Sequence, residues 1–176
     1  PSDHLIENNE KFYKSLKLNL NYLNNQDIFV FGIKPTTSSS QYGYFLTNNK
    51  SKGKNKVSKF IEKPTSLRAK KIIQKGGYWN SGIVFALKSA VWDHFEKYDS
   101  KTLNFCIKSF IKRKNLRKKV ISLNKKEFNK IKEKSFDYAV LEKSEYINGI
   151  KIDVPWSDLG SWKEISKIFN KNKKKY

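Results

Sequence analysis

The stretch "GGYWNSGIVF" (Gly76–Phe85) decides the fold class of this chain. Its second half opens an apolar run, "SGIVFALK" (81–88), that is typical of a buried β-strand. Two glycines, two large aromatic residues and an amide come directly before that run. Glycine allows a backbone to approach another group closely. The pattern therefore places Tyr78, Trp79 and Asn80 at the mouth of a strand, where a ligand can reach them.

Outward from this strand, strand-like runs alternate with stretches of helical periodicity. Further strands are expected at 28–34, 42–47 and 56–64, with two short strands around Asn148 and Gly149. Helices are expected over about four turns after Asn8 and Asn9, after a cap at Thr65 or Ser66, at 89–98 and 102–114, in pieces over 128–144, and at 161–169. Strands that alternate with helices predict an α/β fold built on a sheet.

The composition indicates one folded domain. The chain has 176 residues, of which 38% are hydrophobic, and it contains 12 Phe, 9 Tyr and 4 Trp. It is long enough to bury a core and far richer in aromatic residues than a disordered chain. We expect a folded domain over residues 1–169 and a solvated basic tail over 170–176.

The charge of the chain is strongly positive. It has 37 basic and 16 acidic residues, which gives a formal net charge of +21. Such a charge is typical of proteins that bind nucleic acid or anionic membranes. However, only Arg68, Arg113 and Arg117 are arginines, and the lysines are scattered among asparagines, which a compositional bias of the genome explains more simply. We expect no specific nucleic-acid partner, although a basic adaptor that binds RNA or acidic surfaces stays open.

Cysteine usage and hydropathy bear on the compartment. Cys106 is the single cysteine, so the chain can form neither an internal disulfide nor a zinc site of the cysteine type. No apolar stretch approaches the ~20 residues that span a bilayer, and no signal-peptide pattern is present. We expect a cytoplasmic protein without a membrane partner, and a homo-oligomer stays open.

Five polar residues lie at the ends of strand-like runs: Asp3, Glu62, Lys63, Asn80 and Asp158. Taken singly, each is more simply a turn or surface residue. Their joint placement matters because ligands of α/β sheets bind beyond the carboxyl ends of the strands. Two aspartates are hard oxygen ligands suited to Mg²⁺, and a lysine can bind a phosphate as a point charge. Glu62 and Asn80 suit vicinal sugar hydroxyls.

Seven motifs in a fixed order resemble one enzyme family. They are "PSDH", "GIKPT", "YGYF", "FIEKP", "YWNSGIVF", "FDYAVLEKS" and "WSDLGSW". From Pro1 to about Phe169, the chain resembles mannose-1-phosphate guanylyltransferases, the GDP-mannose pyrophosphorylases of the sugar nucleotidyltransferase superfamily. The resemblance implies a Rossmann-like (GT-A-like) mixed sheet flanked by helices, incomplete at its N-terminus. It also implies transfer of a nucleotidyl group from GTP to α-D-mannose 1-phosphate, which gives GDP-mannose and pyrophosphate.

The resemblance implies roles for the charged residues. Asp3 and Asp158 match aspartates that bind Mg²⁺, and Lys63 matches a lysine that contacts the sugar phosphate. The attacking phosphate is already anionic, so the reaction needs no general base. His4 is then either a residue that orients Asp3 or a packing residue, and His94 is expected to be structural.

The sugar-binding residues follow from the same motifs. Gly43 matches a glycine whose backbone approaches the sugar, Glu62 an acceptor for sugar hydroxyls, and Asn80 an amide that reads the hexose. Trp156 is similar to a tryptophan that lines the pocket. Trp79 is expected to pack beneath Asn80 and not to stack on the sugar.

The chain also departs from the family. Ser38–Gln41 stands where the family usually carries Pro-Glu-Thr-Gly. The Gly-rich loop that holds the nucleotide triphosphate has no counterpart in the 176 residues, and no P-loop pattern is present. We therefore expect the nucleotide-binding half to be supplied in cis or in trans. Two other functions stay open: another sugar-1-phosphate nucleotidyltransferase, and a sugar-phosphate-binding module without catalysis.

Overall fold

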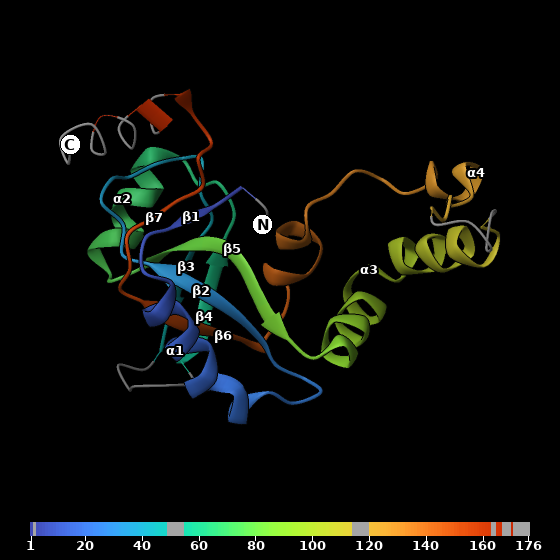
Figure 1. Cartoon of the computed structure of the whole chain (residues 1–176), viewed down its shortest axis with the longest axis horizontal. Coiled ribbons are helices and arrows are strands. Elements are labelled where there is room, and N and C mark those ends of the chain that lie inside the picture. Colours follow the sequence, from blue (N-terminus) through green and yellow to red (C-terminus); the bar gives the residue numbers. More distant parts are fainter. Residues whose placement is uncertain (2, 49–54, 114–119, 163–164, 167–169, 171–176) are drawn as a thin grey trace.

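A five-stranded sheet, a small two-stranded ribbon and connecting helices make up the fold (Figure 1). The computed structural model describes residues 1, 3–48, 55–113, 120–162, 165–166 and 170. Within these residues, the main sheet closes on itself in the order β2-β5-β3-β4-β6, and the ribbon pairs β1 with β7. The strands are β1 (Leu5–Ile6), β2 (Ile28–Ile33), β3 (Tyr44–Thr47), β4 (Asn55–Ile61), β5 (Tyr78–Ala86), β6 (Ile147–Ile152) and β7 (Trp156–Ser157).

Helices separate several of the strands, as the sequence predicts, although β2, β3 and β4 follow one another directly. The helices are α1 (Asn9–Asn19), the 3₁₀ turn η1 (Leu20–Tyr22), α2 (Ser66–Gln74), α3 (Lys88–Ile111), α4 (Lys125–Phe128) and the π-helical turn η2 (Asp137–Leu141). The side chains of Asn8 and Thr65 cap α1 and α2 by accepting from backbone N–H groups of the first turn. None of these described helices is long and apolar enough to cross a membrane. The expected closing helix and basic tail lie mostly outside the described residues.

β2 is the most buried strand of the main sheet, since all six of its residues are buried. It pairs in parallel with β6 and antiparallel with β5, so the sheet is mixed, and the predicted fold class is confirmed. β6 is one continuous strand, so the predicted pair of short strands around Asn148 and Gly149 is wrong. Asn148 Nδ2 donates to Asp27 Oδ1 over 2.9 Å, and Gly149 leaves room for the Phe45 ring. A buried amide with a partner fits a strand interior, so this Asn-Gly pair makes no turn.

β5 starts earlier than the sequence predicts. It begins at Tyr78, so Asn80 lies inside the strand and not at its mouth. The pairing of β5 with β2 shifts register just before Gly32, the residue opposite Asn80. Gly82 has a φ of +73°, a conformation that glycine adopts far more readily than other residues. The strand is therefore irregular directly beside Asn80.

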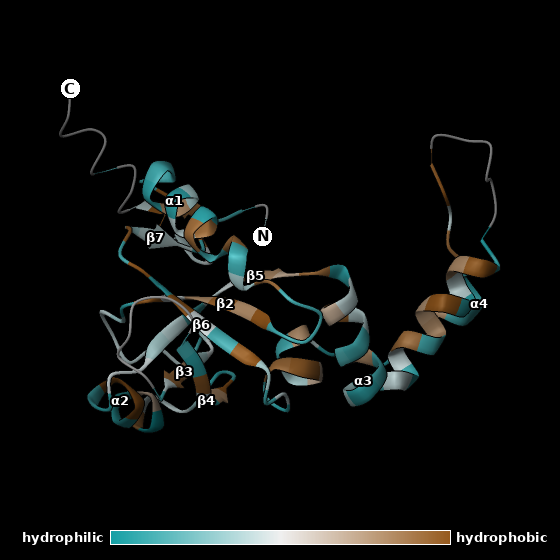
Figure 2. Ribbon diagram, turned by 90° about the horizontal axis from the view of Figure 1, so that it is seen from below, coloured by the Kyte–Doolittle hydropathy of each residue, from teal (hydrophilic) through white to brown (hydrophobic). Residues whose placement is uncertain are grey.

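α3 consists of two helical segments that meet at a break, which agrees with the two helices that the sequence predicts. Asp99 has non-helical backbone angles (φ −152°, ψ 55°) and marks the break. Beyond it, the distal half of α3 and α4 project from the sheet as an arm (Figures 1 and 2). Glu127 of α4 holds the arm together, because its carboxylate accepts from the ammonium groups of Lys112 and Lys130 at 2.7 and 2.8 Å.

The apolar side of the arm is only partly covered. Leu103, Ile107, Phe110 and Ile111 share one side of α3, and a helix of a globular protein normally buries such a side. In the structure, Phe110 is 50% exposed and Ile111 is 69% exposed. The segment that leads into α4 passes Ser109 instead, whose carbonyl accepts from Asn124 N over 3.0 Å.

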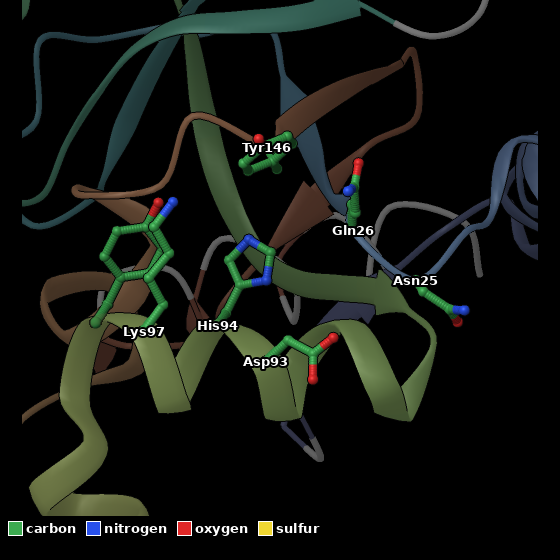
Figure 3. Close-up of a pocket in the computed structure, with 7 residues that line it drawn as sticks. Asn25, Gln26, Asp93, His94, Lys97 and Tyr146 are labelled. Atoms are coloured by element: carbon green, nitrogen blue, oxygen red, sulfur yellow. The ribbon is translucent and has the colours of Figure 1, made fainter.

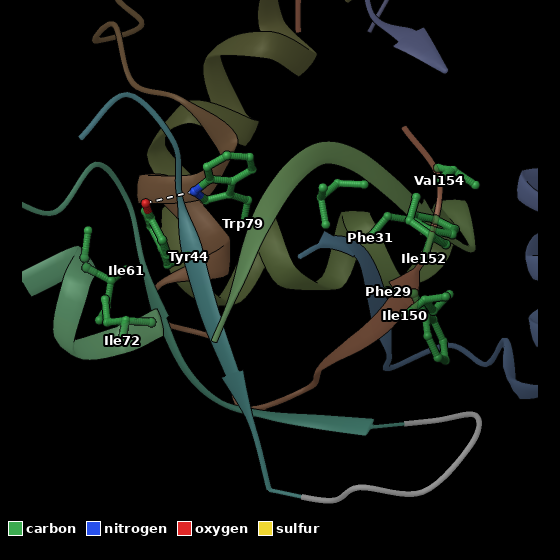
Figure 4. Close-up of a cluster of buried hydrophobic side chains, with 11 residues drawn as sticks. Phe29, Phe31, Tyr44, Ile61, Ile72, Trp79, Ile150, Ile152 and Val154 are labelled. Carbon is green, nitrogen blue, oxygen red and sulfur yellow. Dashed lines mark hydrogen bonds between the residues drawn. The ribbon is translucent and has the colours of Figure 1, made fainter. Parts of the chain in front are cut away.

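A buried hydrogen bond joins two large aromatic side chains in the core (Figure 4). Tyr44 of β3 is fully buried and Trp79 of β5 is 7% exposed. The Trp79 indole N–H donates to the Tyr44 hydroxyl over 2.8 Å, and that hydroxyl donates to the Ser39 carbonyl over 2.8 Å. Trp79 is therefore a core residue, as expected.

Replacing Tyr44 with phenylalanine is expected to lower the free energy of unfolding by about 1–3 kcal/mol, because the buried Trp79 N–H loses its acceptor. Urea denaturation followed by tryptophan fluorescence measures the change. Tyr13→Phe is the matched control, since Tyr13 is 59% exposed. If both variants unfold at the same urea concentration, the buried hydrogen bond does not stabilise the fold.

Candidate active site

One pocket collects most of the polar residues that the sequence singles out. Its volume is about 150 Å³, and five of the expected site residues line it: Gly43, Glu62, Asn80, Trp156 and Asp158. The other lining residues are His4, Gln41, Tyr42, Ser81, Gly82 and Asp137. Asp3 and Lys63, the two remaining expected site residues, are described below.

The ends of strands place most of these side chains. Gly43 comes directly before β3, Glu62 directly after β4, and Asp158 directly after β7. Asn80 lies inside β5, but its backbone N–H donates to the Gly43 carbonyl over 2.7 Å, which brings the two segments together. A Cβ at Gly43 would push the Glu62 carboxyl group out of its present position. Glycine at position 43 thus lets Glu62 lie against the backbone of the pocket.

The β1–β7 ribbon brings together the chain segments that carry Asp3 and Asp158. Leu5 pairs with Ser157 in antiparallel register, so the residues before β1 lie beside those after β7. Burial lowers the pKa of His4, while the Asp3 and Asp158 carboxylates act on it in the opposite direction. Asp3 itself comes shortly before β1 in the chain. The antiparallel ribbon thus sets the segments that carry the two aspartates side by side.

The chemistry of these two carboxylates fits a magnesium ion. Asp158 Oδ1 accepts from the Tyr42 hydroxyl and from Gly160 N, both over 3.1 Å, so this side chain is held in place. Among the residues that the structure describes, no group of three or more His, Cys, Asp or Glu side chains could hold a metal ion. Mg²⁺ at Asp3 and Asp158 would therefore take its other ligands from water and substrate phosphates, as is usual for this ion.

His4 packs against Trp156 in the wall of the pocket. The two rings meet edge to face with centroids 5.3 Å apart, and Trp156 Nε1 donates to His4 Nδ1 over 3.3 Å. An Nδ1 that accepts belongs to a neutral ring with its proton on Nε2, in accord with a pKa that burial lowers. Of the two roles left open for His4, these contacts support packing.

Glu62 and Asp137 bring two carboxyl groups into the pocket beside Asn80. Asp137 Oδ1 accepts from Asn80 Nδ2 over 2.9 Å, and Asn80 Oδ1 accepts from Gly82 N over 3.2 Å. Burial raises the pKa of Glu62 to about 7, and the Asp137 carboxylate adds to that effect. Burial also raises the pKa of Asp137, against hydrogen bonds that stabilise its charged form.

Lys63 lies beside the pocket in an unusual backbone conformation. β4 ends at Ile61, so Glu62 and Lys63 need not point to opposite faces as strand neighbours do. Lys63 has a φ of +44°, in the left-handed region that non-glycine residues rarely adopt. Its positive charge acts to lower the pKa of both Glu62 and Asp137. Leu159, in the loop after β7, is the other described non-glycine residue with positive φ, at +52°. Backbone strain of this kind often gathers at functional sites.

Tyr42 and Asp137 are pocket residues that the sequence reasoning missed. The Tyr42 ring contacts both Trp79 and Trp156, with centroids 4.8 and 5.5 Å away. Both missed residues stand in recognised motifs, "YGYF" and "FDYAVLEKS". Neither follows a strand-like run, which was the signal that selected the other site residues.

A second cavity, of about 250 Å³, is lined by residues of α3 and of two other segments (Figure 3). His94 is buried there, with Nδ1 bonded to the Ala90 carbonyl over 2.7 Å and Nε2 to Ser144 Oγ over 2.8 Å. Both ring nitrogens have partners within the protein, so the structural role expected for His94 is confirmed. Lys97 lies over the Tyr146 ring, 5.6 Å from its centroid. Because its histidine and lysine are engaged with the protein itself, this cavity is the weaker candidate for a site.

Comparison with known proteins shows a sequence family. Residues 1–175 match the nucleotidyl transferase family. The chain is 28% identical to the alginate biosynthesis protein AlgA of Pseudomonas aeruginosa, over 98% of its own length and 36% of that protein. It is 31% identical to the mannose-1-phosphate guanylyltransferase RfbM of Salmonella typhimurium, over 97% of its own length and 36% of that protein. The chain thus spans a little more than a third of the length of these relatives.

Two solved structures have the same fold. A protein described as mannose-1-phosphate geranyltransferase from Thermus thermophilus superposes with a TM-score of 0.79 at 22% identity, over 96% of this chain and 48% of that one. The mannose-6-phosphate isomerase of Helicobacter pylori also gives 0.79, at 25% identity, over 89% of this chain and 62% of that one. With a family match over nearly its whole length and a fold shared with these structures, the chain belongs to the nucleotidyl transferase family.

Proposed function

We propose that the chain is the sugar- and metal-binding part of a mannose-1-phosphate guanylyltransferase. With a nucleotide-binding half present in cis or in trans, α-D-mannose 1-phosphate and GTP would give GDP-mannose and pyrophosphate. The observation that carries the proposal is one pocket in which Glu62, Asn80 and Asp158 meet, with Asp3 and Lys63 beside it. Relatives named mannose-1-phosphate guanylyltransferase in Escherichia coli O157:H7 and Salmonella typhimurium support this choice of reaction.

The size of the pocket suits a sugar better than a complete sugar nucleotide. Its volume of about 150 Å³ lies below the roughly 300–1,000 Å³ common for ligand sites. Pro1 lies at the same pocket, because a Cβ on Gly82 would be 4.0 Å from Pro1 Cγ and 3.6 Å from His4 Cε1. A nucleotide-binding segment joined ahead of Pro1 would therefore enter beside the sugar, where a triphosphate has to meet the sugar phosphate.

In the proposed reaction the chain positions an anion for in-line attack. The phosphate oxygen of mannose 1-phosphate attacks the α-phosphorus of GTP, a new P–O bond forms, and the bond to pyrophosphate breaks. Lys63 attracts the sugar phosphate by charge, and Glu62 and Asn80 bind the hexose hydroxyls. When bound at Asp3 and Asp158, Mg²⁺ supplies charge neutralisation for the phosphates. These side chains remove no proton, because the attacking group is already ionised.

The purified chain is expected to bind mannose 1-phosphate but to release no pyrophosphate from GTP on its own. The reason is that its sequence holds no loop of the kind that cradles a triphosphate. Isothermal titration calorimetry measures the binding, with glucose 1-phosphate as the matched ligand, and a coupled phosphate assay measures turnover. Pyrophosphate release by the chain alone refutes the expected need for a second half. If neither sugar phosphate gives a heat of binding, the proposed function is refuted.

The same titrations separate the remaining functions. Tighter binding of glucose 1-phosphate than of mannose 1-phosphate would point to another sugar-1-phosphate nucleotidyltransferase. Binding without turnover after a nucleotide-binding half is added would indicate a module without catalysis. A random oligonucleotide tests the basic adaptor, since binding through scattered lysines should weaken steeply as salt rises.

A further inference from the structure

The Asn80 amide has one favourable orientation in the pocket. Its Nδ2 donates to Asp137 Oδ1 and its Oδ1 accepts from Gly82 N, over 2.9 and 3.2 Å. A flipped amide would set its oxygen against the Asp137 carboxyl oxygen and its NH₂ group against the Gly82 N–H. Both contacts would be repulsive, and Asn80 is only 7% exposed, so water cannot readily take their place. Asp137 is therefore the acceptor of this pair.

The hydrogen bonds also distinguish the two carboxyl groups. Asp137 accepts from Asn80 and from its own backbone, and both bonds stabilise the charged form. The Glu62 carboxyl group accepts a hydrogen bond from no residue that the structure describes. Its backbone N–H instead donates to Glu142 Oε1 over 2.7 Å, which brings another acidic side chain to the same segment. Two nearby carboxyls in a partly buried site disfavour double ionisation, so the negative charge belongs on Asp137 and the proton on Glu62.

We propose that Glu62 enters the pocket as a neutral carboxylic acid that donates a hydrogen bond to a hexose hydroxyl, and that Asp137 is the positioning residue that keeps Glu62 protonated and holds the Asn80 amide. The identity of the hexose rests on the proposed function. The inference reverses the acceptor role expected for Glu62 and adds Asp137 to the sugar site. A neutral acid beside an amide suits uncharged hydroxyl groups, which both donate and accept.

The surrounding charges agree with a proton on Glu62. The titratable and charged groups that act on it or line the same pocket are Lys63, Asp137, Glu142, His4 and Asp158. Three of these are acidic, and burial lowers the pKa of His4, so the Lys63 ammonium is the main opposing charge. Burial raises the pKa of Glu62 to about 7, so its proton would come off within the neutral range.

Carboxyl ¹³C NMR of the 176-residue chain tests the proton without any ligand. The Glu62 signal, assigned by its loss in Glu62→Gln, is expected to titrate near pH 7, and about one pH unit lower in Asp137→Asn. Asp153→Asn, at an exposed position after β6, is the control and should leave the midpoint unchanged. A Glu62 midpoint near 4.5 in the wild-type chain overturns the proposal, even if Asp137→Asn fails to fold. A midpoint that does not move in a folded Asp137→Asn chain also overturns it.

Calorimetry with mannose 1-phosphate tests whether Glu62 donates. The affinity of the wild-type chain, divided by that of Glu62→Gln at each pH, is expected to fall about tenfold per pH unit above about pH 7.5, as the proton is lost. Dividing by the affinity of the variant cancels the effect that ionisation of the ligand itself has on binding. A ratio that rises with pH shows that Glu62 accepts, and overturns the proposal. If neither protein binds the sugar phosphate, the proposed function fails, and the NMR midpoints alone decide where the proton lies.

Discussion

Asparagine in place of Asp158 is expected to slow GDP-mannose formation on the order of 100- to 1,000-fold in an enzyme that contains the nucleotide-binding half. The Asp158 carboxylate is fixed by the Tyr42 hydroxyl and Gly160 N, and the β1–β7 ribbon sets its segment beside the one that carries Asp3. Asparagine keeps the size and can still accept from both donors, but it carries no charge. The loss should therefore fall on divalent-cation binding and not on the local fold.

Pyrophosphate release measured over a range of Mg²⁺ concentrations checks this expectation, and calorimetry with Mg²⁺ on the chain alone provides a readout that does not need turnover. Asp153→Asn is the control, because Asp153 is exposed and lies only a few residues before β7. The melting temperature of both variants should stay close to that of the unchanged chain. An Asp158→Asn enzyme with full activity and unchanged Mg²⁺ dependence would end the metal-site proposal.

The elements that the sequence predicts well are those decided by local chemistry. α1 and α2 follow their caps, Asn8 and Thr65, because a side-chain oxygen within the first turn satisfies N–H groups there. The sequence predicts β2 because its residues form a continuous apolar run, a pattern typical of a strand that is buried on both faces. The error at Asn148 and Gly149 has a different cause. Their partners, Asp27 and Phe45, lie about a hundred residues away in the sequence, so local turn propensity could not show the strand.

The candidate site divides in the same way. Glu62 and Asp158 were found because each follows a strand directly, and the pocket forms where these strands end. Asp137 and Tyr42 were missed because they enter the pocket through contacts with Asn80 and Asp158, which no spacing rule encodes. Whether a carboxyl group in such a pocket carries its charge depends on neighbours from other strands. Sequence therefore predicts the residue types of the site, and the structure adds the neighbours that hold them and act on their charges.

Alanine in place of Lys63 is expected to weaken the use of mannose 1-phosphate by about 2–4 kcal/mol, the range for truncating one partner of a desolvated charge pair. This corresponds to roughly 30- to 700-fold in kcat/KM. The structure gives the physical reason: β4 ends at Ile61, and the lysine turns at a φ of +44° into a position where its charge acts on Glu62 and Asp137. GTP affinity should barely change, because the triphosphate would be bound by the other half of the enzyme.

The matched control is Lys125→Ala, since Lys125 is exposed on α4, in the arm and away from the pocket. It should change kcat/KM for mannose 1-phosphate by less than about twofold, as is usual for surface positions. Lys63→Gln adds a second comparison, because glutamine keeps most of the length of the side chain but removes the charge. If Lys63→Gln loses as much as Lys63→Ala, the charge and not the side-chain bulk acts on the sugar phosphate. If Lys63→Ala and Lys125→Ala behave alike, Lys63 is one more surface lysine of this basic chain, and its unusual backbone serves the turn after β4 alone.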